Sequence, residues 1–177
     1  MLQKLHTITT FIFDVDGVLT NGNVLVTEHG EQLRQFNIKD GYALQLAVKK
    51  GYHVVIISGA KSAGVEKRLQ GLGIKHIYLG ISDKIAVFRK FIEEHHLDPE
   101  EMVYAGDDIP DLPVMKLVGL AICPADAVDE IKEISEYISP KKGGGGVARD
   151  IIEKVMKIQN KWFDAQPDAH DGSFSKG

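Results

Sequence analysis

The chain has 177 residues, a formal net charge of −4 and a single cysteine, Cys123. Its length is typical of one domain with its own core, and its net negative charge argues against nucleic acid as the main partner. It has no apolar run of the roughly 20 residues that a membrane-spanning helix needs, and its first residues do not resemble a signal peptide. Because a lone cysteine excludes an intrachain disulfide, we expect a cytoplasmic protein without a membrane partner.

The first predicted strand covers residues 11–13 and runs into Asp14 and Asp16. Side chains alternate along an extended chain, so these two carboxylates project from the same face. Carboxylates held close together repel each other unless a cation or a shared proton lies between them, and oxygen ligands without His or Cys favour Mg²⁺. An aspartate can also attack phosphorus and form an aspartyl-phosphate. An Asp-x-Asp pair alone is common in solvated turns, so residues further along the chain must show whether this pair belongs to a functional site.

A β-hairpin is expected at about residues 21–38, where two short strand-like runs flank a glycine-containing turn. A helix over residues 41–50 follows, with Asp40 as its expected N-cap. Four β-branched residues at 54–57 then predict a strand that is buried on both faces. This strand ends in Ser58 and Gly59.

Helices and strands alternate through the rest of the chain. Further helices are expected at residues 61–72, from 83 onward and at 127–134, and further strands at 76–79, 102–105, 120–122 and 137–138. Lys84 lies at the start of the second of these helices, and three acids, Asp107, Asp108 and Asp111, follow the strand at 102–105. The alternation predicts an α/β fold, a three-layer doubly wound parallel sheet with a small hairpin flap and no cap domain.

The C-terminal part begins with four glycines at residues 143–146, which predict a flexible loop. Helical spacing returns over residues 147–163, and the polar residues 164–177 predict a disordered tail. We therefore expect residues 1–163 to form a single domain.

Polar side chains stand at the ends of several predicted strands. The carboxyl ends of parallel strands meet in one crevice, which would bring together the aspartates, the Ser58 hydroxyl and Lys84. Acids for a metal ion together with a hydroxyl donor and a lysine suit a phosphoryl group. Each of these residues alone has an ordinary structural explanation, but their joint occurrence favours a catalytic site.

These motifs resemble those of the haloacid dehalogenase-like phosphohydrolases, at residues 14–20, 57–59, 84 and 106–111. The resemblance implies that Asp14 is the nucleophile and that Asp16 protonates the leaving group and then activates water. It also implies an Mg²⁺ ion held by Asp14, the backbone carbonyl of Asp16 and Asp107. Ser58, Gly59 and Lys84 would bind the phosphoryl group, with Asp108 and Asp111 in support.

The spacing of the motifs leaves no room for a lid domain, because 44 residues separate Asp14 from Ser58 and 26 separate Ser58 from Lys84. The chain is similar to the lidless subgroup that hydrolyses 3-deoxy-D-manno-octulosonate 8-phosphate. The resemblance thus implies a small-molecule sugar phosphate as substrate, and we expect a homotetramer, because apolar residues on the hairpin edges need a covering partner. The alternative substrates are nine-carbon sugar acid 9-phosphates (3-deoxy-nonulosonate or N-acylneuraminate), because Ala60 occupies the position where these relatives carry a charged residue. Candidates to meet the sugar carboxylate are Lys39, Lys61, Lys67, Arg68 and Arg149.

Two other classes of protein use similar residues. A receiver-like signalling domain also has an acid cluster, a hydroxyl and a lysine, but its phosphoacceptor aspartate lies alone on a middle strand. A catalytically idle regulatory module is the second alternative, and the intact Asp14, Asp16, Lys84 and Asp107 argue against it. The sequence therefore favours an Mg²⁺-dependent phosphatase.

Overall fold

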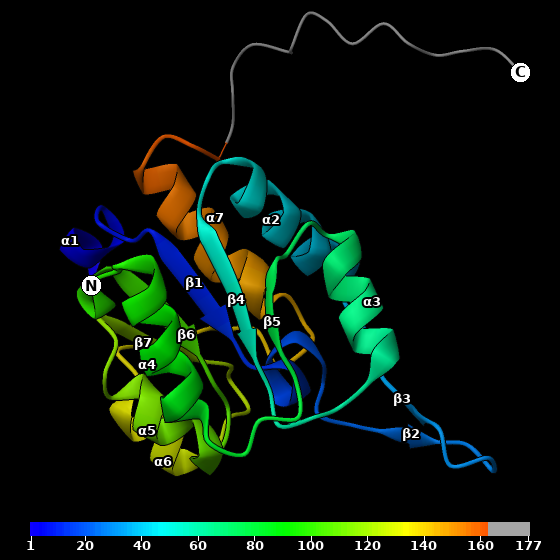
Figure 1. Ribbon diagram of the computed structural model, residues 1–177. Coiled ribbons are helices and arrows are strands. Elements are labelled where there is room, and N and C mark those ends of the chain that lie inside the picture. Colours follow the sequence, from blue (N-terminus) through cyan, green and yellow to red (C-terminus); the bar gives the residue numbers. More distant parts are fainter. Residues whose placement is uncertain (163–177) are drawn as a thin grey trace, which may run out of the picture.

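The computed structural model describes residues 1–162, so the tail expected at residues 164–177 lies outside the described part. Within that part, six strands form one parallel sheet in the spatial order β5-β4-β1-β6-β7-β8 (Figure 1). The strands are β1 Thr10–Phe13, β4 His53–Ile57, β5 His76–Tyr78, β6 Met102–Ala105, β7 Leu120–Cys123 and β8 Tyr137–Ile138. Every neighbouring pair runs parallel, which confirms the predicted sheet.

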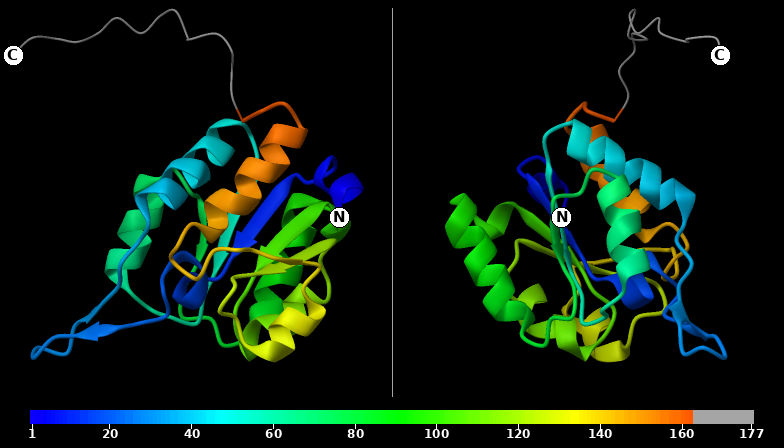
Figure 2. Two further views of the ribbon diagram at one scale, coloured as in Figure 1. Left: turned by 180° about the vertical axis from the view of Figure 1, so that it is seen from behind. Right: turned by 45° about the vertical axis from the view of Figure 1, so that its right-hand side comes forward.

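Helices cover both faces of the sheet (Figures 1 and 2). They are α1 Leu2–Leu5, α2 Ile38–Lys49, α3 Ala63–Gly71, α4 Lys84–His95, α5 Leu112–Met115, α6 Asp129–Ile134 and α7 Val147–Ile158. Buried residues of α2, α3 and α7 share one apolar cluster with one face of the sheet, and those of α4, α5 and α6 share a second cluster with the other face. The predicted three-layer α/β architecture is therefore confirmed.

Strand β1 is the structural centre of the molecule. Phe11 and Phe13 point into the first apolar cluster, and Ile12 points into the second. All three side chains are fully buried, and both edges of β1 are paired, to β4 and to β6. The residue that follows this strand, Asp14, is therefore held by the most enclosed part of the fold.

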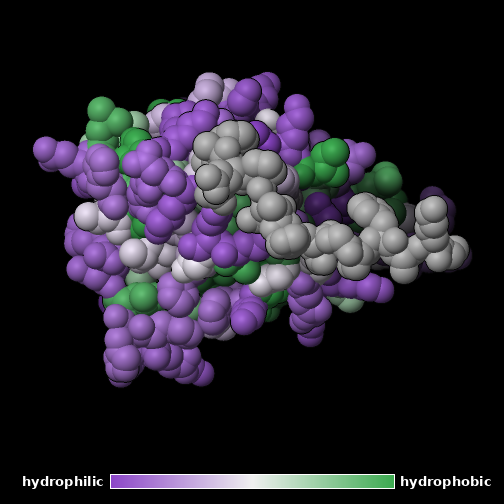
Figure 3. Space-filling model, turned by 90° about the horizontal axis from the view of Figure 1, so that it is seen from above, coloured by the Kyte–Doolittle hydropathy of each residue, from purple (hydrophilic) through white to green (hydrophobic). Residues whose placement is uncertain are grey.

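The expected hairpin is present and consists of β2 Leu25–Val26 and β3 Gln32–Leu33, which pair antiparallel. Figure 2 shows it extending away from the sheet and helices. Its apolar side chains face solvent, with Leu25 67% and Val26 62% exposed. By contrast, the face seen in Figure 3, where the sheet strands begin, is mainly hydrophilic with small separate apolar groups. The hairpin is thus an unusual concentration of exposed apolar surface.

The predicted N-cap of the second helix was wrong. Helix α2 begins at Ile38 and is capped by Asn37, whose side chain accepts a hydrogen bond from the Lys39 backbone N–H at 2.8 Å. Asp40 is buried instead and accepts a hydrogen bond from the Arg149 backbone N–H, at the start of α7, at 2.7 Å. Asp40 is therefore a tertiary cap, because it satisfies a free N–H in the first turn of another helix.

Three other helix boundaries differ from the predicted ones by two to five residues. Helix α3 begins at Ala63 behind a Ser62 cap, α6 begins at Asp129, and α7 ends at Ile158 rather than at residue 163. In residues 1–162, no helix is both long enough and apolar enough to cross a bilayer.

Candidate active site

The chain turns sharply where β1 ends. Asp14 precedes a tight turn at Val15–Leu19, and its Oδ1 accepts a hydrogen bond from the Val15 backbone N–H at 2.7 Å. Gly17 lies within this turn with a φ of 86°, a left-handed conformation that glycine adopts without strain. Residues 14–20, which carry the two candidate catalytic aspartates and are called the catalytic loop below, place Asp14 at a cavity at the carboxyl ends of the strands.

The cavity has a volume of about 480 Å³. The structure brings eight of the predicted site residues to its walls: Asp14, Asp16, Ser58, Gly59, Lys84, Asp107, Asp108 and Asp111. They come from the ends of β1, β4 and β6 and from the first turn of α4. This is the crevice in which ligands of open α/β sheets bind.

Three of these acids form a cluster that suits a divalent cation. One carboxylate oxygen from each of Asp14, Asp107 and Asp111 lies within 4.8 Å of the other two. The Oδ1 atom of Asp107 is buried and has no hydrogen-bond partner. Because a buried carboxylate oxygen is costly to leave unpaired, this atom fits the position of a metal ligand.

The three acids are not equivalent. Both oxygens of Asp111 are already engaged, Oδ1 by Lys84 and by the Tyr104 hydroxyl at 2.7 Å each, and Oδ2 by the Asp107 backbone N–H at 3.1 Å. Each oxygen of Asp14 has one partner, the Val15 N–H or Lys84, and only Asp107 keeps an unpartnered oxygen. Asp107 is therefore the strongest candidate ligand and Asp14 the next, whereas Asp111, which has three partners, orients Lys84 and the Asp107 loop.

The electrostatics of the cluster also favour a cation. Burial and the charge of Asp111 raise the pKa of Asp14 to about 6, although Lys84 opposes that rise. Burial and the charges of Asp14 and Asp111 raise the pKa of Asp107 to about 7. Buried acids of like charge thus bind protons more readily than isolated ones, and a divalent cation would relieve the same repulsion.

Lys84 supplies the positive charge of the site. Its amino group lies 3.1 Å from Asp14 Oδ2 and 2.7 Å from Asp111 Oδ1. Burial by itself would lower the pKa of Lys84, but the charges of Asp14 and Asp111 raise it above its ordinary value. Lys84 is therefore a fixed cation beside the candidate nucleophile.

Ser58 occupies the end of β4, where it is almost fully buried. Its hydroxyl oxygen accepts a hydrogen bond from the Ala60 backbone N–H at 3.3 Å, so the hydroxyl hydrogen stays free to donate into the cavity. This geometry suits the binding of an oxyanion.

The comparisons with known proteins agree with this chemistry. A family model described as haloacid dehalogenase-like hydrolase matches residues 80–151. The Escherichia coli K12 protein named 3-deoxy-D-manno-octulosonate 8-phosphate phosphatase KdsC is 37% identical over 166 residues, which cover 94% of this chain and 88% of that protein. The chain belongs to the haloacid dehalogenase-like hydrolases.

Solved structures of relatives match most of the chain. The 3-deoxy-D-manno-octulosonate 8-phosphate phosphatase of Yersinia pestis has a TM-score of 0.89 and 35% identity, over 91% of this chain and 87% of that one. The Moraxella catarrhalis phosphatase of the same name, in complex with a magnesium ion, a phosphate ion and a KDO molecule, has a TM-score of 0.88 and 33% identity, over 91% of this chain and 92% of that one.

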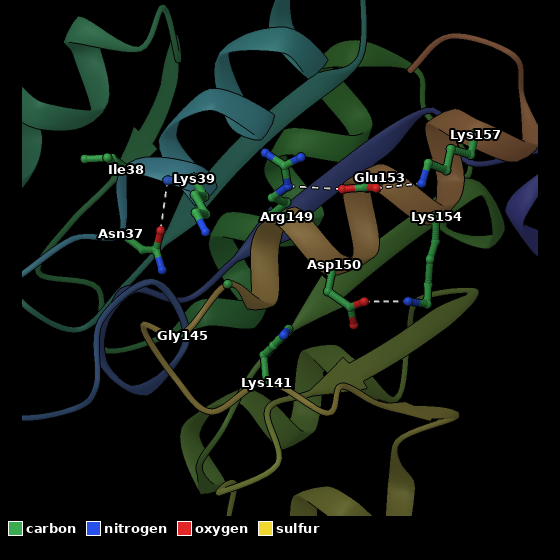
Figure 4. Close-up of a pocket in the computed structure, with 11 residues that line it drawn as sticks. Asn37, Ile38, Lys39, Lys141, Gly145, Arg149, Asp150, Glu153, Lys154 and Lys157 are labelled. Atoms are coloured by element: carbon green, nitrogen blue, oxygen red, sulfur yellow. Dashed lines mark hydrogen bonds and ion pairs between the residues drawn. The ribbon is translucent and has the colours of Figure 1, made fainter. Parts of the chain in front are cut away.

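None of the five candidate contacts for a sugar carboxylate, Lys39, Lys61, Lys67, Arg68 and Arg149, lines the catalytic cavity of this hydrolase chain. Lys39 and Arg149 line a second cavity of about 470 Å³ along α7 and beside the start of α2, shown in Figure 4. Lys61 lies against Gly80, and Arg68 packs against Gly41 of α2. Lys61 directly follows Ala60, which does line the catalytic cavity, whereas Arg68 lies on α3. The sequence does not show which of the two cavities a basic residue lines, because glycine-containing turns lie beside both cavities.

The second cavity is rich in basic side chains, but most of them are paired. Arg149 Nε lies 3.1 Å from Glu153, whose other oxygen pairs with Lys157, and Lys154 pairs with Asp150 (Figure 4). Most of the positive charge that lines this cavity is therefore balanced by neighbouring carboxylates.

The glycines at 143–146 form a packed turn rather than the expected flexible loop. A Cβ atom at Gly143 would lie 2.1 Å from the Gly17 carbonyl oxygen, and one at Gly144 would lie 2.7 Å from the Asn21 backbone nitrogen. The Gly144 N–H donates to the Val18 carbonyl at 3.0 Å. The glycines thus let this turn lie directly on the backbone of the catalytic loop.

One residue that contacts a site aspartate was not among the candidates predicted from the sequence. Arg34, just after β3, binds Asp16 with both arms of its guanidinium, Nε to Oδ1 at 2.8 Å and Nη2 to Oδ2 at 3.0 Å. Its only sequence signal is a basic residue at the end of a hairpin strand, which is ordinarily a solvated charge.

Proposed function

We propose that this chain is an Mg²⁺-dependent phosphomonoesterase that hydrolyses 3-deoxy-D-manno-octulosonate 8-phosphate to the free sugar acid and phosphate. The observation that carries the proposal is the cavity in which Asp14, paired with Lys84 at 3.1 Å, faces the unpartnered Oδ1 of Asp107. Relatives that are 33–37% identical carry this phosphatase name, and one of them is described with magnesium, phosphate and KDO.

In the first step, a carboxylate oxygen of Asp14 attacks phosphorus and the bond between phosphorus and the sugar oxygen breaks. Asp16 gives its proton to the departing sugar oxygen, because an alkoxide is a poor leaving group. Lys84 and the Ser58 hydroxyl bind the phosphoryl oxygens, where negative charge collects. The products of this step are the sugar acid and an aspartyl-phosphate on Asp14.

In the second step, Asp16 accepts a proton from a water molecule, which attacks the aspartyl-phosphate and releases phosphate. Asp14 returns to its carboxylate form. When bound between Asp14 and Asp107, Mg²⁺ would offset the negative charge of the carboxylates and of the phosphoryl group.

The alternative substrate class, a nine-carbon sugar acid 9-phosphate, rests on Ala60. This small residue lines the catalytic cavity beside Gly59. An alanine leaves space and supplies no charge, so we expect a looser preference between sugar acids than in relatives with a charged residue there.

A panel of phosphate esters tests the function. We expect kcat/KM for the eight-carbon substrate to exceed that for nine-carbon analogues, with Mg²⁺ present. A tenfold or larger preference for a nine-carbon substrate would favour the alternative. Failure to hydrolyse any sugar phosphate or aryl phosphate would instead favour a regulatory module without activity.

We also propose that the chain works as a homotetramer in the cytoplasm. The exposed edges of the hairpin, with Leu25, Val26 and Leu33, are an apolar surface that a second copy would cover. Such an arrangement would let a neighbour close a site that has no lid. We expect light scattering to give four chains per particle, and Leu25→Asp to lower that number, whereas Glu28→Gln at the hairpin tip should not. A fully active monomer at micromolar concentration would contradict this assembly.

A further inference from the structure

The bond between Arg34 and Asp16 joins the hairpin to the catalytic loop. The guanidinium makes two parallel hydrogen bonds to the carboxylate, at 2.8 and 3.0 Å, and a third to the Gln32 carbonyl at 3.3 Å. Bidentate pairs of this kind fix the orientation of the carboxyl group. Asp16 is thereby held by a residue that lies 18 positions away in the sequence.

Burial makes this pair different from an ordinary surface ion pair. The Arg34 side chain is only 6% exposed, although the neighbouring Leu33 is 48% exposed. The Asp16 side chain is 31% exposed and lines the catalytic cavity. Arg34 thus lies behind Asp16, and Asp16 keeps one side open toward the place where a phosphate ester would bind.

The rest of the catalytic loop leaves the Asp16 side chain weakly held. Its other hydrogen bond comes from the Thr20 hydroxyl, at a long 3.4 Å. Asp14, by comparison, is fixed by a short bond from the Val15 N–H and by Lys84. The rotamer of Asp16 therefore depends mainly on Arg34.

We propose that Arg34 is a positioning residue that orients Asp16 for proton transfer to the leaving group. The inference rests on the proposed phosphatase reaction, in which Asp16 is the general acid. Misplacing an acid by about 1 Å can cost about 10²-fold in rate, so a side chain that fixes the acid has a measurable effect without contacting substrate. Arg34 belongs to the flap, and its guanidinium therefore links the flap to the candidate general acid.

The dependence of kcat/KM on the leaving group distinguishes a residue that positions the general acid from one that binds phosphate or only stabilises the fold. A sugar phosphate releases an alkoxide that needs a proton, whereas 4-nitrophenyl phosphate releases a stable phenolate that does not. The value of kcat/KM reports only the steps up to departure of the leaving group. Loss of Asp16 orientation should therefore lower kcat/KM for the sugar phosphate and leave that for the nitrophenyl ester almost unchanged.

The experiment compares wild type with Arg34→Ala and Arg34→Lys on both substrates. We expect Arg34→Ala to lower kcat/KM for the sugar phosphate by about 10- to 100-fold, and that for 4-nitrophenyl phosphate by less than about 3-fold. Arg34→Lys should give an intermediate value, because an ammonium replaces the two-armed contact with a point charge. Arg89→Ala, at an exposed arginine of α4, is the matched control and should behave as wild type.

A double-mutant cycle tests whether Arg34 acts through Asp16. Adding Arg34→Ala to Asp16→Asn should cause no further loss on the sugar phosphate. Thermal unfolding of each variant shows whether the fold is intact. A general loss of structure would lower kcat/KM for both substrates together.

Three results would overturn the proposal. Equal losses of kcat/KM on the two esters would show that Arg34 is a phosphate-binding or purely structural residue. No loss of kcat/KM on either ester would show that the Arg34–Asp16 pair has no part in catalysis. A rise in kcat/KM for the sugar phosphate would mean that Arg34 hinders proton donation by Asp16. If wild type hydrolyses neither ester, the phosphatase proposal itself fails, which is a separate outcome from any change caused by Arg34.

Discussion

The α-carbon of Gly17 lies directly against the carboxylate of Asp107, since a Cβ atom at position 17 would be 1.8 Å from Asp107 Oδ2. This contact joins the loop after β1 to the loop after β6. It leaves no space for any side chain at position 17, and it sets where the second candidate metal ligand lies relative to Asp14.

Replacing Gly17 with alanine should therefore disrupt the metal site. The new methyl group would push Asp107 away, and the φ of 86° is unfavourable for alanine. We expect at least a tenfold loss of Mg²⁺ affinity by calorimetry and a loss of turnover of about 10²-fold or more. Gly71→Ala is the control, because nothing lies within 4 Å of its Cβ position in α3. Normal Mg²⁺ binding by Gly17→Ala would contradict this account of the site.

Asp14→Asn should abolish phosphate release without unfolding the protein. An amide cannot form the aspartyl-phosphate, and no other residue replaces a lost nucleophile. Asp16→Asn should slow turnover of a sugar phosphate by about 10²-fold or more, as expected for a lost general acid. Phosphate release and circular dichroism measure the two effects. Turnover near the wild-type level by Asp14→Asn would refute the proposed mechanism.

Removal of divalent cations with EDTA should inactivate the enzyme, and Mg²⁺ should restore it, whereas Ca²⁺ should support little activity because it prefers more and longer oxygen contacts. Protons should compete with Mg²⁺, since the pKa of Asp14 is raised to about 6 and that of Asp107 to about 7. The apparent Mg²⁺ affinity should therefore fall as the pH drops from 8 to 5.5. Calorimetry at several pH values measures this, and a pH-independent affinity would argue against these two ligands.

Asp40→Asn should stabilise the protein at pH 8 more than at pH 5. Burial raises the pKa of Asp40 to about 6, and its Oδ2 atom has no hydrogen-bond partner. A carboxyl whose pKa is higher in the folded than in the unfolded state favours folding at low pH, and that contribution is lost as the pH rises through about 6. Asparagine keeps the acceptor for Arg149 N–H without the charge, so the gain at pH 8 is at most about 3 kcal/mol.

The control for Asp40→Asn is Asp129→Asn, because the Asp129 side chain is 94% exposed. Unfolding temperatures of both variants and of wild type, measured at pH 5 and pH 8, decide the matter. A gain for Asp40→Asn that is equal at the two pH values would show that its charge has no part in the effect.

Gly143→Ala should impair both kinds of substrate alike. Its methyl group would lie 2.1 Å from the Gly17 carbonyl oxygen, so the glycine turn would be pushed off the catalytic loop. We expect similar losses of kcat/KM for a sugar phosphate and an aryl phosphate, together with a lower unfolding temperature. Gly64→Ala is the control, because its Cβ atom would lie 3.9 Å from the Ser62 hydroxyl oxygen, an ordinary contact. A rise in KM confined to the sugar acid would instead indicate that the turn contacts substrate.

Much of the fold and of the site could be predicted from local patterns. The β-branched run of β4 and the apolar run of β1 signalled buried parallel strands, and each ended in a residue that now lines the catalytic cavity, Ser58 or Asp14. Parallel topology brings strand ends together, so the convergence of these residues followed from the order of the elements alone.

The contacts that were missed depend on three-dimensional packing. Arg34 reaches Asp16 because the hairpin leaves the catalytic loop and returns beside it, and no spacing in the sequence encodes that path. Asp40 caps α7 because α2 and α7 pack together, over a separation of 109 residues. Arg149 was assigned to the substrate by its charge, but its helix carries it to a different cavity.

The central place of β1 in the sheet has a consequence for synthesis on the ribosome. Its partner β6 begins only at Met102, so a growing chain of about 100 residues already carries Asp14, Ser58 and Lys84 but neither Asp107 nor the second neighbour of β1. Magnesium cannot assist folding at that stage through the proposed site, because its candidate ligand Asp107 has not been made. During this interval the apolar edge of β1 stays open to pairing with other chains, and a nascent chain stalled before residue 102 should depend on a chaperone to stay unaggregated.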